Sequence, residues 1–388
     1  MKPTPLLLMS DSPSQMTGLA RITKDIALIA AEQPEFRVAT YGRGGLGSIQ
    51  LPFHQYDFAE TAQWGECTLQ DVWQDFSRSA PGVLLTIWDP SRLGWLARPR
   101  MGGNMERWLR DRPFQLWGYI PVDSFGPNGR LTAYVRDTLK GFDRLLAYTL
   151  WGKQVLEDTL GQEVDWMPHG YNPQVFQPYG KSPGRQLLRL PKEVPLVGMV
   201  ATNQARKDWG LAFQAIAALR QRVPNLKFWA HIDLLERYWS LPALITDYHL
   251  ESTVIVTLSG QLNNQGLAYC YSACDVTMLP SGGEGFGYPI VESMACGVPC
   301  VHGKYGGGVE QIPDKQCLVD PAGFRLDTIW NSVRPVWNPA DWAESLYRLL
   351  EEPLEPSVFT QAVSHLQWPA LAPQWAKWLK AGLKGGPA

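Results

Sequence analysis

Two glutamates in a glycine-rich segment are the residues whose types and spacing point most directly to chemistry in this chain of 388 residues. Glu284 lies in the glycine-rich run Pro280–Pro289, and Glu292 lies in the helix predicted to follow it. Glycines allow close approach of the backbone to a ligand, and amides at a helix start attract anions such as phosphate. Carboxylates accept paired hydrogen bonds from hydroxyls, so the two glutamates can hold two sugar rings. The plainer alternative is a tight turn with one helix-stabilising and one solvated glutamate.

Arg206 and Lys207 form a second candidate group, directly before the helix predicted to begin near Trp209. A guanidinium and an ammonium in this place can stabilise the charge that grows on a departing diphosphate, without a metal ion. The sequence has no Asp-x-Asp motif to carry a divalent metal, so no metal and no cofactor are expected. Two adjacent basic residues often form only a solvated surface, and this is the alternative interpretation.

Candidate residues in the N-terminal half follow predicted strands. Gly18 ends the polar loop after the first strand, where it is either a ligand-facing glycine or an ordinary helix start. Asp89 and Asp123 follow two later strands. Each can accept a hydrogen bond from an acceptor hydroxyl or cap a helix.

The segment Ser91–Arg112 is strongly basic in a chain of formal net charge -2, with six arginines and two acidic residues. Two tryptophans lie among these arginines. Arginines with aromatic neighbours suit a phosphate-bearing acceptor such as nucleic acid, an anionic lipid or a phosphorylated polymer. The acceptor candidates are Arg92, Arg98 and Arg100, and the alternative is a solvated amphipathic helix.

The elements that must position these residues alternate between strands and helices, in two series. This rhythm predicts two doubly wound α/β domains with parallel sheets, whose ligands bind at the carboxyl ends of the strands in a central cleft. The proline-rich segment 172–195 lacks sustained periodicity and is the predicted linker. The predicted domains are residues 1–180 for the acceptor, residues 181–365 for the donor, and a helical segment 366–388 that crosses back over the junction.

The bulk composition excludes several classes of protein. The near-neutral charge argues against a protein that coats polyanions over its whole surface. An uninterrupted apolar run long enough to span a membrane is not found, and the six cysteines lack the spacing of a disulfide scaffold or a zinc site. A cytoplasmic protein with reduced thiols is expected.

The run from Gly283 to Pro299 resembles the signature of retaining glycosyltransferases of the GT-B fold, in family 4, which includes glycogen synthase-like and mannosyltransferase-like enzymes. Their pattern is Glu-Gly-Phe-Gly, then Pro, then Glu-(Ala/Ser)-Met-Ala-x-Gly-x-Pro. Further similar segments are Met167–Asn172, Gly198–Lys207, Ala273–Pro280 and Gly306–Glu310.

This resemblance implies a role for each candidate. Glu284 would bind the transferred sugar and Glu292 the ribose of a nucleotide sugar such as UDP-glucose. The amides of Gly285, Phe286 and Gly287 would lie near the sugar and the diphosphate, as would Gly18. Arg206 and Lys207 would hold the diphosphate. Many relatives carry a further arginine about five residues before this lysine, where this chain has Thr202 and Asn203. Asn203 is therefore a candidate neutral donor.

The acceptor stays open at this point. A DNA glycosyltransferase for hydroxymethylated bases, a glycolipid or polysaccharide enzyme, and a sugar phosphorylase all fit the same fold. A sugar-binding or nucleotide-binding protein without turnover is the alternative from another class.

Overall fold

The computed structural model describes residues 2–45, 49–58, 63–328 and 331–384. The chain divides into two compact units, Met1–Gly170 with Pro369–Ala388, and Tyr171–Trp368. The boundaries between the units fall near residues 170 and 368, whereas the sequence predicted boundaries at residues 180 and 365. The segment predicted as a linker packs within the second unit, since the Arg185 side chain is buried and donates to the Ala273 carbonyl at 3.1 Å.

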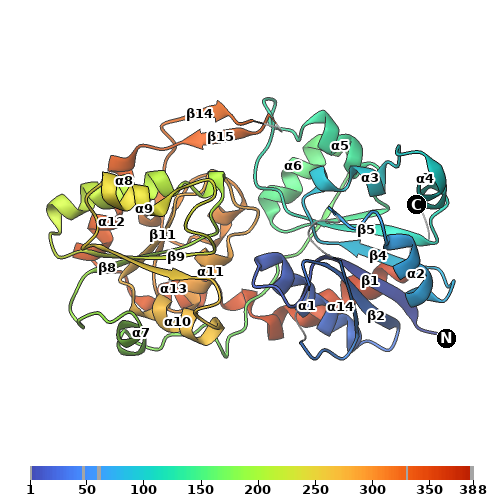
Figure 1. The fold of residues 1–388 in the computed structure, drawn as a ribbon, viewed down its shortest axis with the longest axis horizontal. Coiled ribbons are helices and arrows are strands. Elements are labelled where there is room, and N and C mark those ends of the chain that lie inside the picture. Colours follow the sequence, from blue (N-terminus) through green and yellow to red (C-terminus); the bar gives the residue numbers. More distant parts are fainter. Residues whose placement is uncertain (1, 46–48, 59–62, 329–330, 385–388) are drawn as a thin grey trace. The chain divides into compact units, whose positions relative to one another are not determined.

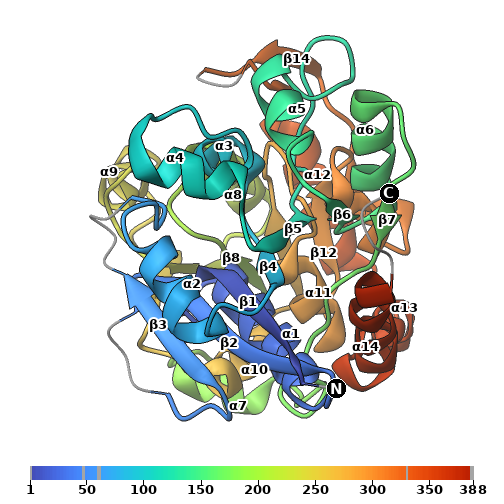
Figure 2. The same cartoon turned by 90° about the vertical axis from the view of Figure 1, so that its right-hand side faces the viewer.

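The first unit (unit 1) is built on a seven-stranded parallel sheet of order β3-β2-β1-β4-β5-β6-β7, which can be followed in Figure 2. The strands are β1 Thr4–Asp11, β2 Phe36–Arg43, β3 His54–Phe58, β4 Gly82–Thr86, β5 Phe114–Ile120, β6 Arg144–Ala147 and β7 Asp165–Trp166. The central strands are apolar and buried along nearly their whole length. Parallel strands that are covered on both faces have this pattern.

The helices of unit 1 connect these strands. They are α1 Gly18–Ala31, α2 Leu69–Ser77, α3 Gly94–Ala97, α4 Gly103–Arg110, α5 Ala133–Leu139 and α6 Leu150–Leu160. The final helix α14, Trp368–Lys384, returns to this unit, where Trp375 packs edge-on against Tyr119 and Trp378 against Trp117. The C-terminal tryptophans are therefore part of the core.

The second unit (unit 2) has a six-stranded parallel sheet of order β10-β9-β8-β11-β12-β13. The strands are β8 Leu196–Val200, β9 Lys227–Ile232, β10 Val254–Leu258, β11 Val276–Leu279, β12 Cys300–Gly303 and β13 Leu318–Val319. The helices are α7 Ser182–Leu187, α8 Trp209–Arg222, α9 Leu241–Asp247, α10 Asn264–Ala273, α11 Tyr288–Ala295, α12 Pro339–Glu351 and α13 Pro356–Ala362. Helices α8 and α12 pack together, as do α7 and α10, and Figure 1 shows these pairs on opposite faces of the sheet.

A separate antiparallel hairpin follows β13 in unit 2. Its strands are β14 Gly323–Leu326 and β15 Val333–Val336. In the view of Figure 1 the hairpin lies above helices α8 and α9.

The two predicted doubly wound sheets are confirmed. Several elements were not predicted from the sequence, among them β3, α2 and the hairpin. None of the helices in the described ranges is long and apolar enough to cross a membrane.

Candidate active site

The glycine-rich loop of unit 2 connects β11 to α11 and brings Glu284 against two basic residues. Lys207 Nζ donates to Glu284 Oε1 at 2.5 Å, and Arg206 Nη1 donates to the same oxygen at 3.0 Å. Glu284 and Lys207 are buried, whereas the Arg206 side chain is about one quarter exposed, at 26%. Burial alone would raise the pKa of Glu284, but the charges of Lys207 and Arg206 dominate and lower it to about 2. The carboxylate is therefore ionised throughout the physiological range.

The backbone around Glu284 is held by a second glycine loop. Gly307 N–H donates to the Glu284 carbonyl at 2.9 Å. A Cβ atom on Gly306 would lie only 3.0 Å from that carbonyl oxygen, and Gly306 has a φ of 84°. Only glycine fits both the contact and the left-handed backbone. This packing fixes the place of the Glu284 side chain.

Arg206 also fixes the start of the loop. Its Nη1 donates to the Gly283 carbonyl at 2.6 Å, and its own carbonyl accepts from Gly282 N–H at 2.6 Å. Arg206 and Lys207 lie in a short 3-10 turn, Ala205–Lys207, which ends at Asp208 before α8. The turn directs both side chains toward the same loop.

Helix α11 begins directly after this loop. Gly287 caps it with a φ of 88°, a conformation that suits glycine. Phe286 is buried, and its ring lies 5.8 Å from that of Tyr288. Gly285 is partly exposed. Glu292 follows inside the helix, almost fully buried, and accepts a hydrogen bond from the Tyr271 hydroxyl at 3.1 Å.

Asn203 is buried and uses its side chain to hold a neighbouring loop. Its Nδ2 donates to the carbonyls of Leu234 and Trp239, and its Oδ1 accepts from the Trp239 amide at 2.9 Å. Its backbone N–H donates to Asp233. These contacts give Asn203 a structural task in the loop after β9.

The candidates of unit 1 lie at the carboxyl ends of its strands. Gly18 is the first residue of α1, after the cap residue Thr17, which donates to Asp11 at 2.7 Å. Asp89 caps the short turn after β4, where its Oδ1 accepts from Ser91 N–H at 2.8 Å. The Asp89 side chain is partly open to solvent, but protein atoms surround its carboxylate on most sides. The resulting desolvation is the larger cause, and the charge of Asp123 the next, that raises the pKa of Asp89. Asp123 itself accepts from the Ser124 hydroxyl.

The arginines of Ser91–Arg112 contact different partners. Arg98 pairs with Asp137 at 3.3 Å, and Arg112 pairs with Asp143 at 2.8 Å. Arg100 is exposed, and Arg92 stacks on the Trp64 ring at 5.1 Å. Arg43 stacks on the same ring at 4.5 Å. The basic segment is thus partly neutralised by acidic residues that lie outside it, which the sequence alone did not reveal.

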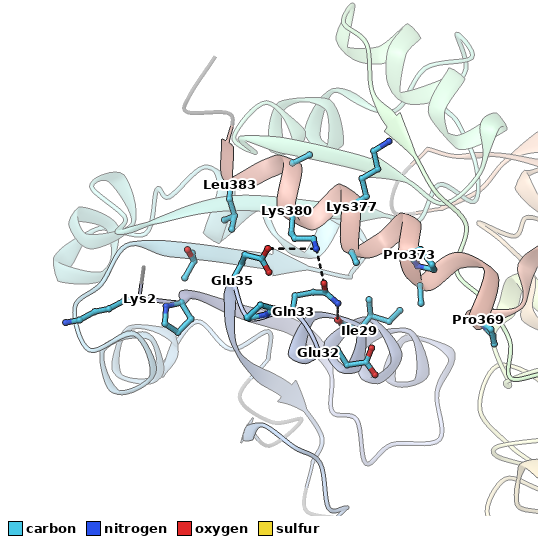
Figure 3. A pocket seen from close by; sticks show the side chains of 16 residues that line it. Lys2, Ile29, Glu32, Gln33, Glu35, Pro369, Pro373, Lys377, Lys380 and Leu383 are labelled. Atoms are coloured by element: carbon cyan, nitrogen blue, oxygen red, sulfur yellow. Dashed lines mark hydrogen bonds and ion pairs between the residues drawn. The ribbon is translucent and has the colours of Figure 1, made fainter.

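A cavity of about 1400 Å³ in unit 1 lies away from all of these residues. Figure 3 shows it between the end of α1 and helix α14, with Lys380 joined to Glu35 and Gln33 on its wall. None of the residues predicted for the site lines it.

Comparison with known proteins agrees with this architecture. Residues 183–362 match the sequence family described as glycosyl transferases group 1. Among curated relatives, the D-inositol 3-phosphate glycosyltransferase of Nocardiopsis dassonvillei is 28% identical over 220 residues, covering 54% of this chain and 48% of that protein. The enzyme of the same name from Acidothermus cellulolyticus is 24% identical over 330 residues, covering 81% and 68%. The chain thus spans about half to two thirds of their length.

Solved structures with the same fold cover almost the whole chain. The sucrose-phosphate synthase of Thermosynechococcus elongatus has a TM-score of 0.74 at 17% identity, covering 99% of this chain and 100% of that one. The Anabaena protein Alr3699/HepE, solved in complex with UDP-glucose, has a TM-score of 0.73 at 16% identity, covering 97% and 99%. The chain therefore has the GT-B fold of these structures, and residues 183–362 are similar to the glycosyl transferases group 1 family.

Proposed function

We propose that this chain transfers a hexose-like sugar from a nucleotide diphosphate sugar to an acceptor hydroxyl. The observation that carries the proposal is the buried Glu284 carboxylate, held by Lys207 at 2.5 Å and Arg206 at 3.0 Å on a glycine loop. A carboxylate and two cations at one loop match the two halves of such a donor. The carboxylate accepts sugar hydroxyls, and the cations take the diphosphate.

The remaining donor contacts follow from the order of the elements. The amides of Gly285, Phe286 and Gly287 lie at the start of α11, where backbone N–H groups favour an anion. Glu292 is buried deeper in the same helix and takes the ribose hydroxyls. The HepE structure contains UDP-glucose, which supports this donor as the first probe.

The proposed reaction retains the configuration of the sugar and needs no metal ion. The bond between the anomeric carbon and the diphosphate oxygen breaks, and the acceptor oxygen bonds to that carbon on the same face. The acceptor proton passes to the departing phosphate oxygen. Arg206 and Lys207 stabilise the charge on the leaving diphosphate, which is the task that a divalent cation performs elsewhere.

The acceptor is proposed to carry a phosphate group and to be bound by unit 1. Supporting this is the pair Arg43 and Arg92, whose guanidinium groups both lie over the Trp64 ring. The named activity of the curated relatives, on D-inositol 3-phosphate, also supports it. Asp89 would accept the hydrogen bond of the attacking hydroxyl.

A nucleotide-release assay tests the function. The protein is incubated with UDP-glucose, other nucleotide sugars, and inositol 3-phosphate as acceptor, with and without EDTA. Release of nucleoside diphosphate that depends on acceptor and persists in EDTA is expected, and NMR of the product should show the anomer of the donor. Release that requires inorganic phosphate would indicate a phosphorylase. No release with any donor would indicate a binding protein.

Salt-sensitive binding of duplex DNA in a gel-shift assay would favour the DNA acceptor instead.

A further inference from the structure

Two neighbouring tyrosines of unit 1 differ in how their hydroxyls are used. Tyr119 lies on β5 and Tyr148 directly follows β6, and their ring centroids are 4.1 Å apart. The Tyr119 hydroxyl donates to the Met167 carbonyl at 2.8 Å. The Tyr148 side chain is only 4% exposed, and its hydroxyl has no hydrogen-bonding partner among the described residues. A buried hydroxyl normally has a partner, because leaving it unbonded is unfavourable. The Tyr148 hydroxyl is therefore suited to a group from outside the chain.

The Tyr148 side chain is held in place by its neighbours. Its ring packs edge-on against that of His169, with centroids 4.8 Å apart, as well as against Tyr119. The next residue, Thr149, caps helix α6 by accepting from the Gly152 N–H at 3.0 Å. The position of the hydroxyl is thus set by the end of β6, the start of α6 and two aromatic contacts.

The sheet of unit 1 places Tyr148 beside two carboxylates. Strands β1, β4, β5 and β6 are adjacent in it, and their register aligns one row of residues, Met9, Thr86, Gly118 and Leu145. Asp11, Asp89 and Tyr148 follow this row at nearly the same level, at the carboxyl ends of β1, β4 and β6. We call these three residues the strand-end group. Because Asp89 is partly open to solvent, a ligand can enter the strand-end group from its side.

The strand-end group contains one hydrogen-bond donor and two acceptors. Burial raises the pKa of the Tyr148 hydroxyl well above its ordinary value, and the charges of Asp11 and Asp89 raise it further, so the hydroxyl keeps its proton. A carboxylate can accept about four hydrogen bonds. Asp11 accepts from Thr17 at 2.7 Å and from the Trp88 indole at 3.4 Å, and Asp89 accepts from the Ser91 N–H. Both carboxylates can therefore accept further hydrogen bonds.

Few chemical groups can bond to a phenol and to a carboxylate at once. A phosphate oxygen accepts from the phenol, but carboxylates repel it. An ammonium group suits the carboxylates, but it cannot accept from the phenol. A hydroxyl does both, since its oxygen accepts one hydrogen bond and its hydrogen makes another. One phenol beside two carboxylates therefore suits two neighbouring hydroxyls of one ligand.

We propose that Tyr148 is an acceptor-binding residue and that the acceptor is a polyol. The attacking hydroxyl of the polyol donates to Asp89, and the hydroxyl next to it accepts from Tyr148 and donates to Asp11. This inference rests on the proposed transfer to an acceptor in unit 1, and it narrows the class of that acceptor. A hydroxymethylated base or a simple lipid alcohol offers only one hydroxyl to the strand-end group.

Calorimetric titration with matched ligands, with and without UDP, tests this role. D-inositol 3-phosphate and cyclohexyl phosphate share a cyclohexane ring and a phosphate, but only the first carries neighbouring hydroxyls. The wild type should bind the polyol at least about tenfold more tightly. Tyr148→Phe should weaken binding of the polyol about tenfold, because one hydrogen bond is lost, and leave binding of cyclohexyl phosphate within about twofold. Glucose 6-phosphate and glycerol 3-phosphate serve as further polyols.

Thermal unfolding separates a binding role from a structural one. The Tyr148 hydroxyl has no partner among the described residues to lose, so Tyr148→Phe should unfold at the temperature of the wild type or slightly above it. Tyr119→Phe is the matched control, since it loses the hydrogen bond to the Met167 carbonyl. It should unfold at a lower temperature and bind the polyol as the wild type does.

The outcomes separate this role of Tyr148 from the function it rests on. If the wild type binds none of the three polyols, or if Tyr148→Phe binds them as tightly as the wild type, the proposal is overturned. It is also overturned if Tyr148→Phe unfolds at a lower temperature and loses affinity for cyclohexyl phosphate equally. If the wild type binds a polyol through Tyr148 but releases no nucleotide from any nucleotide sugar, the proposed function fails and the polyol site stands.

Discussion

The two sheets of this protein share a topology, but the charged candidate residues beside them differ in burial and in pairing. In unit 2 a carboxylate, an ammonium and guanidinium groups gather on one buried loop, where Glu284 is the common partner. In unit 1 the candidate residues are more open, and two of the arginines, Arg98 and Arg112, are paired with acids outside their own segment. Buried charge is costly unless it is paired or binds a ligand, whereas exposed pairs contribute little. The comparison supports the proposal that donor binding depends on the buried loop of unit 2, whereas acceptor binding depends on more open residues of unit 1.

Removing the shared carboxylate should give the largest effect. Glu284→Gln keeps the size of the side chain but removes the negative charge that Lys207 and Arg206 contact, and it replaces one carboxylate oxygen proposed to accept sugar hydroxyls. Sugar transfer should fall by about 1000-fold, at the upper end for loss of one stabilising group. The rate of nucleotide release measures this. The matched control Glu344→Gln removes an exposed carboxylate of α12 and should retain full activity. A Glu284→Gln protein that is folded and active would refute the assignment of unit 2.

Removing one cation should have the next largest effect. Lys207→Ala deletes a buried ammonium that is proposed to stabilise the departing diphosphate. Transfer should fall by about 100-fold, and UDP affinity should fall with it. Lys304→Ala removes an exposed lysine of the same unit and serves as control. Equal kinetics for the two variants would show that Lys207 has only a structural role.

The pH dependence of stability should show that the buried Glu284 charge contributes more to folding than exposed ion pairs do. Because its pKa is lowered from 4.5 to about 2, this group stabilises the folded state fully above pH 4.5 and loses that contribution as the pH falls toward 2. The contribution should be about 3 kcal/mol in the free energy of unfolding, since one pKa unit corresponds to about 1.4 kcal/mol. Urea unfolding of the wild type and Glu284→Gln at about pH 6 and about pH 3 measures it. The difference between the two proteins should shrink at the lower pH, and a constant difference would contradict the ion pairing.

Substitution of Asp89 in unit 1 should affect the reaction of the acceptor and lower the transfer rate less than the changes in unit 2. Asp89→Asn keeps a group that can cap the turn after β4 but removes the charge that is proposed to orient the attacking hydroxyl. The rate of transfer should fall by about tenfold, while hydrolysis of the donor without acceptor stays unchanged. Steady-state kinetics with varied acceptor provide the measurement. A parallel loss of donor hydrolysis would mean that Asp89 serves the donor instead.

The smallest effect should come from an arginine that is already paired. Arg98→Gln breaks a partly exposed ion pair with Asp137, which should change the free energy of unfolding by about 1 kcal/mol or less. The KM for a phosphate-bearing acceptor should change by less than about threefold. Arg92→Gln removes the guanidinium that lies over the Trp64 ring, and it should raise the KM for this acceptor more than Arg98→Gln does. A larger rise in KM for Arg98→Gln than for Arg92→Gln would indicate that the acceptor binds near Asp137 instead.

The sequence predicted the loop that carries Glu284 better than the residues that surround it. The glycines around Glu284 and the basic pair before α8 are close in sequence to the strands that place them, so local pattern was sufficient. Arg334 could not be found in this way, since it reaches the loop from a hairpin after β13 and meets Gly282 only in three dimensions. The acidic partners Asp137 and Asp143 of the basic segment were hidden for the same reason. The sequence predicted Asn203 as a donor ligand, and the structure shows its side chain bonded to a neighbouring loop, so that role stays a prediction.

The central claim is that the loop of Glu284, Arg206 and Lys207 binds a nucleotide sugar, and thermal unfolding with ligand tests it most directly. A ligand that binds only the folded state raises the unfolding temperature according to its affinity. We predict that UDP-glucose, or another nucleotide sugar in a panel, raises the unfolding temperature of the wild type and of Glu344→Gln. The same ligand should have little effect on Lys207→Ala. No stabilisation of the wild type by any nucleotide sugar, or equal stabilisation of Lys207→Ala, would contradict the account.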